Sequence, residues 1–541
     1  MIKDIFNRLS AAVGRMFNPA PPAPPAKPPK TPVVAKQPVP SPITAQQVPP
    51  VREPEKATPE PAAIVKKSTP RRLPRMWNIG LDFGTAFTKC IVRRSDEAFI
   101  VPLLGDQFLL PSDVYVGKSK LGLSGDSMDD ERPVRVQNLK MALAEFAEDN
   151  TAGLWAANFL RLREHEPQID LFANPTSLTI YFLARTIQKA KAFILTKSPD
   201  FNEAHGDRCF INMAVPVAHA EKTLIADKFE HCLRQAWLLA SESNLPNWDQ
   251  QQIGVALKNL NGTTLSADEL PCYLYPEVSA NVQSYIKSRA GADGLYLFVD
   301  VGAGTVDLSI FIYYTHPSND RPITYIEAGV IHLGSSQIEI RVAQNLIQNT
   351  QRISTYCDGI SPADTGQILV KLQEVIRAVK EGRKKDEFLF QTMRATETLL
   401  EDELLIQAAK VLGVARIKMI QDANGQNLIA GADQWRRLQL LIGGGGAGSA
   451  LYSNAVNAWF DLCRNPRPAP KPMPLPQDLK WPASFSAERQ ASDFRRFTVA
   501  YGLSFYRADL EEHRYPKEVH RVAGVYEETP DRPHAPSKDE C

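Results

Sequence analysis

Two segments of the sequence place an aspartate at the end of an apolar run and follow it with a turn of small residues. They are NIGLDFGTAFTK, residues 78–89, and LYLFVDVGAGTVD, residues 295–307. Glycine in such a turn lets backbone N–H groups point into a concavity that fits phosphate oxygens. Threonine hydroxyls add donors, and a carboxylate at the strand end can hold hydrated Mg²⁺. Together these residue types favour a polyphosphate site.

The two segments form an internal repeat of strand, turn and strand, in which Asp82 and Asp300 take equivalent positions. Two such hairpins that faced each other would bind a polyphosphate from both sides. A single hairpin with glycine after aspartate is common, so one copy alone would be weak evidence. The alternative is two unrelated hairpins.

A third cluster of small residues lies at LQLLIGGGGAGSALYSNAV, residues 438–456. The pattern predicts a strand, a loop with glycine at 443–446 and again at 448, and then a helix. Such a loop allows a flat or anionic ligand to approach the backbone at the start of the helix. The segment has neither the Gly-Lys-Ser/Thr of a Walker loop nor the spaced glycines of a dinucleotide fingerprint.

Taken in order, these motifs resemble those of the actin-like ATPase superfamily, which includes actins, sugar kinases and the nucleotide-binding domain of the seventy-kilodalton heat-shock chaperones. Residues 82–89 resemble its phosphate-1 motif, residues 300–307 its phosphate-2 motif, and residues 443–448 its adenosine motif. The resemblance implies an α/β fold of two duplicated ribonuclease-H-like lobes around a nucleotide cleft.

Within the superfamily the chaperone branch is the most similar. Three more segments resemble its Val-Pro strand with a long helix, its Gly-containing turn with a helix, and its closing helix: residues 211–240, 328–347 and 499–504. By resemblance the ligands are ATP and Mg²⁺, and Asp82 and Asp300 would organise the metal. The backbone contacts to phosphate and adenosine would come from Gly84, Thr85, Ala86, Phe87, Gly302, Ala303, Gly304, Thr305, Gly444 and Gly445.

Two lysines are candidates for the charge near the γ-phosphate. Lys89 stands where actins place a phosphate-contacting lysine, and Lys140, in VQNLKMAL, is similar in place to the chaperones' catalytic lysine. A compact ammonium at either position would offset the charge that develops on the phosphate. Surface lysines are common, and both candidates stay open.

The carboxylate that orients the attacking water has two alignments in YPEVSANVQSY. Alignment of the helix start with the chaperones selects Glu277, whereas alignment of the prolines puts Tyr275 there and implies little or no hydrolysis. Glu277 is the preferred candidate, and a plain helix-start carboxylate is the alternative. Glu374 and Arg377 have the spacing of the helix that contacts adenine and ribose in chaperones, although a solvated helical face explains these charges equally well.

The chain divides by composition into a short N-terminal segment, a Pro-rich linker, a folded body with a late Pro-rich insertion, and a charged tail. The apolar residues of the first segment recur at helical spacing among basic residues, which predicts an amphipathic helix for a membrane surface or a partner's groove, or one packed on its own domain. The predicted bounds are 1–17 for this helix, 18–76 for the linker, 77–508 for the body, 464–477 for the insertion and 509–541 for the tail; the body comprises lobe I at 77–295, lobe II at 296–490 and a closing helix at 491–508.

Composition limits the classes of function. The chain has 541 residues with 62 basic and 61 acidic side chains, which argues against a general affinity for nucleic acid. The 7 cysteines are scattered without a CxxC pair, so neither a disulfide framework nor a metal cluster is expected, and a reducing cytoplasm is favoured. No apolar run has the length of a membrane span.

These expectations lead to an ATP-binding and slowly ATP-hydrolysing chaperone-like switch that regulates or recruits partner proteins. About thirty residues follow the body, too few for the chaperones' peptide-binding domain and lid, so substrate refolding by the usual route is not expected. The alternative is an actin-like filament protein with a membrane-binding N-terminal helix, which Lys89 and residues 1–17 both fit. A small-molecule kinase would need a substrate-binding aspartate that the sequence does not identify.

Overall fold

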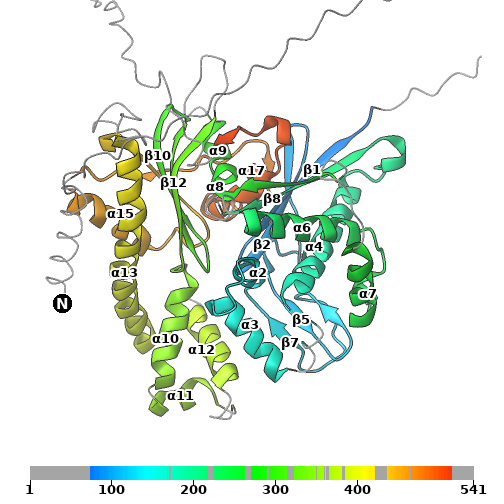
Figure 1. Ribbon diagram of the computed structural model, residues 1–541, viewed down its shortest axis with the longest axis horizontal. Coiled ribbons are helices and arrows are strands. Elements are labelled where there is room, and N and C mark those ends of the chain that lie inside the picture. Colours follow the sequence, from blue (N-terminus) through cyan, green and yellow to red (C-terminus); the bar gives the residue numbers. More distant parts are fainter. Residues whose placement is uncertain are drawn as a thin grey trace, which may run out of the picture. The chain divides into compact units, whose positions relative to one another are not determined.

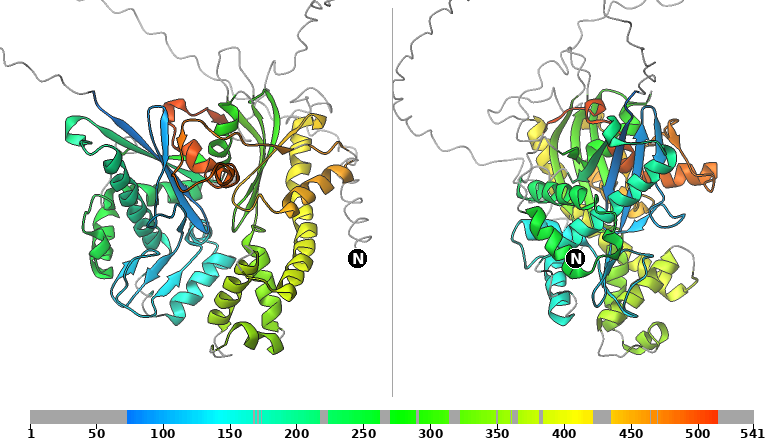
Figure 2. Two further views of the ribbon diagram at one scale, coloured as in Figure 1. Left: turned by 180° about the vertical axis from the view of Figure 1, so that it is seen from behind. Right: turned by 90° about the vertical axis from the view of Figure 1, so that its right-hand side faces the viewer.

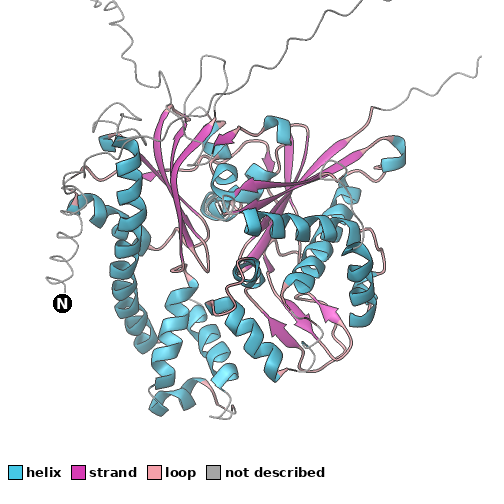
Figure 3. Cartoon of the chain, viewed as in Figure 1, coloured by secondary structure: helices cyan, strands magenta, loops and turns pink. Residues whose placement is uncertain are grey.

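The computed structural model (Figures 1 and 3) describes residues 73–514 except for short internal gaps at 167–168, 170–171, 173, 217–222, 262–269, 289–290, 314–321, 349, 359, 361–364, 381–383, 421–434, 464 and 469. The predicted helix at 1–17, most of the Pro-rich linker and the end of the tail lie outside the described residues. The described part is α/β with mixed sheets, as the sequence predicts.

The first sheet has the order β15-β3-β2-β1-β8-β9, with β4 paired to β2. Its centre is β1 (Met76–Phe83), which runs antiparallel to β2 (Phe87–Arg94) and parallel to β8 (Arg208–Val215). Beyond them lie β3 (Glu97–Ile100) and β9 (Cys272–Pro276). The helices α4 (Thr176–Lys197) and α6 (Thr223–Leu239) share one apolar core with this sheet.

The second sheet has the order β14-β13-β10-β11-β12-β16. Here β10 (Gly294–Val301) runs antiparallel to β11 (Val306–Tyr313) and parallel to β13 (Gln439–Gly443). β12 (Ile323–Ile331) continues the sheet from β11. Its core is closed by α10 (Ser336–Gln348), α12 (Thr365–Lys380), α13 (Glu387–Ile420) and α15 (Ala450–Leu462). Figure 2 shows the long helix α13, in yellow, running past this sheet.

Smaller elements complete the described part. The remaining strands are β4 (Leu110–Pro111), β5 (Val114–Val116), β6 (Leu121–Gly122), β7 (Val134–Val136), β14 (Pro470–Lys471), β15 (Leu479–Lys480) and β16 (His513–Arg514). The remaining helices include α2 (Leu139–Ala147), α3 (Leu154–His165), α7 (Gln250–Asn261), α8 (Glu277–Asn281), α9 (Gln283–Ile286), α11 (Thr350–Tyr356), α16 (Ala487–Asp493), η4 (Phe494–Arg496) and α17 (Thr498–Leu503). None of the described helices is long and apolar enough to cross a membrane.

The two sheets share one pattern of pairing. The orders β3-β2-β1-β8 and β12-β11-β10-β13 correspond strand by strand. In each, three neighbouring strands pair antiparallel, and the fourth, β8 or β13, pairs in parallel with β1 or β10. In the first hairpin Asp82 lies opposite Lys89, and in the second Asp300 lies opposite Asp307. Asp82 and Asp300 therefore take equivalent positions, near the ends of β1 and β10.

The Pro-rich segment and the start of the tail both contribute to the sheets. Within residues predicted as a surface insertion, β14 pairs with β13. Just after it, β15 pairs with β3, and Asp478 accepts a bond of 2.6 Å from Arg93. At the start of the tail, β16 pairs with β12. These short edge strands escape sequence analysis because proline and charged residues hide the strand pattern.

The short helix α17 is packed by direct backbone contact. A Cβ on Gly80 of β1 would lie 2.3 Å from the carbonyl oxygen of Ala500, and a Cβ on Gly502 would lie 1.9 Å from that of Ala280 in α8. The side-chain amide of Asn78 donates to the carbonyls at the end of α17, and Asn212 does the same. α17 therefore links β1 to α8, where Glu277 is the first residue.

Gly502→Ala is expected to destabilise the protein by about 1–3 kcal/mol, because the added methyl group meets a backbone carbonyl that cannot move alone. Gly413→Ala in α13 is the matched control. A Cβ there meets no atom within 4 Å, so the change should stabilise the helix by about 0.5–1 kcal/mol. Denaturant unfolding measures both. Equal stability of the two variants would contradict the packing of α17 on α8.

Candidate functional site

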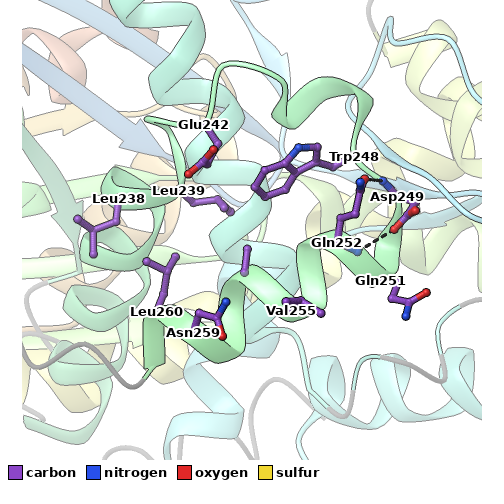
Figure 4. A pocket seen from close by; sticks show the side chains of 11 residues that line it. Leu238, Leu239, Glu242, Trp248, Asp249, Gln251, Gln252, Val255, Asn259 and Leu260 are labelled. Carbon is purple, nitrogen blue, oxygen red and sulfur yellow. Dashed lines mark hydrogen bonds between the residues drawn. The ribbon is translucent and has the colours of Figure 1, made fainter.

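A cavity of about 1090 Å³ lies where the two hairpin turns, the glycine loop and the starts of several helices converge. The helices that contribute are α2, α8, α10, α12, α13, α15 and α17, together with η4. A second cavity of about 610 Å³ lies between the end of α6 and α7 (Figure 4). It has Trp248 and Val255 on its wall and contains none of the predicted site residues.

The two turns approach each other across the first cavity. A Cβ on Gly304 would lie 3.0 Å from Cγ2 of Thr85, so glycine at this position lets the turns come together. The carbonyls of Gly302, Ala303 and Gly304 accept bonds from the N–H groups of 335, 336 and 334. The peptides of the described residues are trans. In a trans peptide the N–H points opposite to the carbonyl, so the N–H groups of 303, 304 and 305 point away from residues 334–336.

Four carboxylates, here called the acid cluster, come together beside the turns: Asp82, Glu277, Asp300 and Asp307. Two of them have lysine partners: Asp82 contacts Lys89 at 2.7 Å, and Glu277 contacts Lys140 at 3.0 Å. The other two accept neutral donors. Asp300 accepts from the amide of Asn281, and Asp307 accepts from the hydroxyl of Thr305, each at 3.0 Å. The cluster thus carries more acid than base.

Burial and this excess of negative charge shift the pKa values of Asp300, Asp307 and Lys140. Burial, together with Glu277, Asp307 and Asp82, raises the pKa of Asp300 well above its ordinary value. Burial and then Glu277 raise the pKa of Asp307 to about 7, and Lys140 opposes the shift. Burial lowers the pKa of Lys140, but Glu277 and Asp82 outweigh it, so the net shift is upward. Lys140 therefore stays protonated. Even so, two lysines face four carboxylates, so the site has fewer cations than acids.

The glycine loop is shaped to fit against the acid cluster. Gly444 has a φ of +85°, which glycine adopts without strain. A Cβ there would also lie 2.3 Å from Oδ1 of Asp300. The N–H of Gly446 donates to the carbonyl of Val301 at 2.9 Å and joins the loop to the end of β10. The loop and the second turn are therefore one structural unit.

The structure brings most of the predicted site residues together in the cavity. Its lining includes Asp82, Gly84, Thr85, Ala86, Phe87, Lys89, Lys140, Glu277, Asp300, Gly302, Ala303, Thr305, Arg377, Gly444 and Gly445. Gly304 is not among the lining residues, and it faces Thr85 of the first turn. Glu374 does not line the cavity: its side chain is 55% exposed and lies 3.7 Å from Lys371.

The two alignments for the water-orienting residue have different positions in space. Glu277 lines the cavity as the first residue of α8. Tyr275 precedes it in β9, its hydroxyl donates to the carbonyl of Glu511, and its ring packs edge-on against His513. Tyr275 does not line the cavity. The geometry therefore favours the alignment that selects Glu277.

Some lining residues were not candidates from the sequence. The internal repeat could have identified Asp307, since its distance from Asp300 in the sequence equals that of Lys89 from Asp82. Glu339 in α10 accepts from Arg377 at 3.0 Å and from Lys380 at 3.2 Å, and it is one of the acids that the helices contribute to the lining. No local pattern identifies it, because the pairing joins two helices. Arg495 and Arg496 also line the cavity.

No family model matches this sequence, and no curated protein sequence matches it. The arrangement of the site therefore carries the functional argument. Within the described residues, no group of three His, Cys, Asp or Glu side chains is arranged to hold a metal ion by itself. A Mg²⁺ that binds with phosphate needs only one or two carboxylates from the protein.

Asp307 gives the ligand-free protein a pH dependence. Because its pKa is raised to about 7 by burial and Glu277, the folded chain keeps a proton that the unfolded chain has lost above pH 3.8. Stability is therefore lost as the pH rises through the folded pKa. We expect the free energy of unfolding, measured in urea without nucleotide or metal, to fall between about pH 4 and about pH 7. Asp307→Asn should flatten this slope, and an unchanged slope would contradict the assignment.

Proposed function

We propose that this chain is an ATP-binding and slowly ATP-hydrolysing switch of the actin-like, chaperone-like type. The observation that carries the proposal is the meeting of two equivalent Asp-turn hairpins and a glycine loop in one cavity. The shared strand order of the two sheets supports a duplicated ribonuclease-H-like architecture, which is part of the proposal.

The acid cluster fits a magnesium ion. Oδ1 of Asp82 and Oδ1 of Asp307 are buried and have no hydrogen-bond partner in the described structure. An ion pair or metal contact would offset the cost of burying these oxygens. Asp82 and Asp300 would hold the metal, directly or through water. Bound Mg²⁺ would neutralise charge on the phosphates and on the leaving oxygen.

The protein's own groups have distinct roles in hydrolysis. Glu277 can accept a hydrogen bond from the attacking water and orient it, since its carboxylate is held at the cavity by Lys140. The ammonium groups of Lys140 and Lys89 and the N–H groups of the second turn stabilise negative charge on the phosphates. Lys140 also contacts Glu277 at 3.0 Å, which fixes the position of this carboxylate.

The switch needs a connection between the site and the packing of the lobes. Glu277 begins α8, whose Ala280 contacts Gly502 of α17, and α17 also contacts Gly80, two residues before Asp82. Outside the cavity lining, Met141 and Trp155 pack with Ile340 of α10. A ligand that favours one spacing of Glu277 and Asp82 would therefore favour one arrangement of α17.

The test is ATP binding and hydrolysis by the purified full chain, with and without Mg²⁺. We expect Mg-dependent binding and turnover below about 1 s⁻¹, the low end of ordinary enzyme rates. Absence of binding at millimolar ATP would overturn the proposal. Sedimentation in the same buffers separates the switch from the filament alternative, which requires ATP-dependent pelleting.

A further inference from the structure

Two neighbouring arginines in the cavity form no ion pair with any residue that the structure describes. Arg495 and Arg496 of η4 line it, and each is half-buried with a buried Nε that makes no hydrogen bond. Within the described structure neither guanidinium has an ion pair. The other cations of the lining are paired with acids: Lys89 with Asp82, Lys140 with Glu277, Arg377 and Lys380 with Glu339, and Arg394 with Glu397.

Arg495 occupies space that glycine leaves open. A Cβ on Gly448 would lie 2.8 Å from Nη1 and 2.9 Å from Nη2 of Arg495, so the guanidinium lies against the bare backbone of the glycine loop. At its other end the loop meets Asp300, at Gly444. The loop therefore runs from the acid cluster to an unpaired arginine, and the cavity is acidic at one end and basic at the other.

The two ends need different groups of a ligand. A metal-bound triphosphate suits the acid cluster. A guanidinium is planar and weakly hydrated, stacks on aromatic rings, and donates to ring nitrogens and carbonyls. A nucleobase offers both a flat face and acceptors, and no ion pair of the described residues occupies either guanidinium.

We propose that Arg495, with Arg496 beside it, binds the nucleobase and is the specificity-determining residue at that end of the site. The inference rests on the proposed function, since it places the base of a nucleotide whose phosphates lie at the acid cluster. The residue comes from η4, directly before α17, so contact with the base also reaches the helix that links β1 and α8.

The experiment compares Mg-ATP with inorganic magnesium tripolyphosphate, which lacks the base, as ligands of the full chain. Arg495→Met should weaken ATP binding about 10- to 100-fold, the effect of a lost charge-assisted contact, and change tripolyphosphate affinity less than about twofold. Arg495→Lys should not restore ATP affinity, because the planar group is lost while the charge remains. Arg394→Met is the matched control, since Arg394 lines the same cavity but is paired and 65% exposed.

Folding is checked in the same variants. Arg495 forms no ion pair with a described residue, so its replacement leaves no buried acid without a counter-charge. Arg495→Met should therefore unfold without ligand at the wild-type temperature or higher, and only the rise in unfolding temperature that ATP causes should become smaller. Unchanged ATP affinity, an equal loss for both ligands, or full rescue by lysine would each overturn the inference and leave the proposed function intact. A wild-type protein that binds neither ligand would instead overturn the proposed function, and the inference with it.

Discussion

Asp300→Asn is expected to lower Mg-ATP affinity or turnover by about 100-fold or more, while the ligand-free protein keeps its stability or gains some. Asp300 is buried, and its charge is disfavoured first by burial and then by Glu277, Asp307 and Asp82. Asparagine removes that charge, and its carbonyl can still accept from the amide of Asn281. Titration calorimetry with Mg-ATP and thermal unfolding without ligand measure the two effects.

The opposite pattern is expected at a buried aspartate outside the cavity. Asp207 is fully buried and accepts the backbone N–H groups of Arg75 at 2.7 Å and Asn202 at 2.8 Å. Asp207→Asn weakens charge-assisted bonds, so it should cost about 1–3 kcal/mol of stability and leave ATP affinity unchanged. If Asp300→Asn lost stability and kept ATP affinity, Asp300 would be a structural acid like Asp207.

The part of the site that follows local patterns was predictable from the sequence. Asp82 and Asp300 stand at strand ends before small turns, and the turn chemistry itself specifies hairpins. The α/β class follows from the same alternation of strands and helices. Glu374 shows the limit of this approach, because helical spacing left a nucleotide contact and a solvated face equally open for it. The structure places its side chain on the exposed face, whereas Glu339 on another helix lines the cavity.

Residues whose role depends on packing between distant segments could not be found this way. Arg495 is notable only because it forms no ion pair with a described acid and because Gly448 has no side chain, and both facts belong to the folded chain. Likewise, the choice between Tyr275 and Glu277 depends on where β9 ends. Pro276 closes the strand and precedes the helix, which brings the second of the two residues into the cavity.

Glu277→Gln is expected to reduce ATP turnover about 10²- to 10⁴-fold while ATP affinity changes only a few-fold, because the loss falls on the step in which a carboxylate orients or deprotonates water. The amide is nearly isosteric and can still accept from Lys140, which lies 3.0 Å from the carboxylate. The substitution also removes one negative charge from the acid cluster, so the affinity for the anionic nucleotide should not fall. Single-turnover hydrolysis and equilibrium binding separate the two quantities.

Tyr275→Phe is the matched control, because it tests the other alignment of the same segment. Its hydroxyl donates to the carbonyl of Glu511, outside the cavity, so its removal should cost about 0.5–1.5 kcal/mol of stability and leave turnover unchanged. Normal turnover in Glu277→Gln would exclude this carboxylate from the chemistry. A selective loss in Tyr275→Phe, with stability intact, would move the reacting water toward β9. Because the two residues are separated only by Pro276, the pair of variants distinguishes a carboxylate in the cavity from a merely local change at the start of α8.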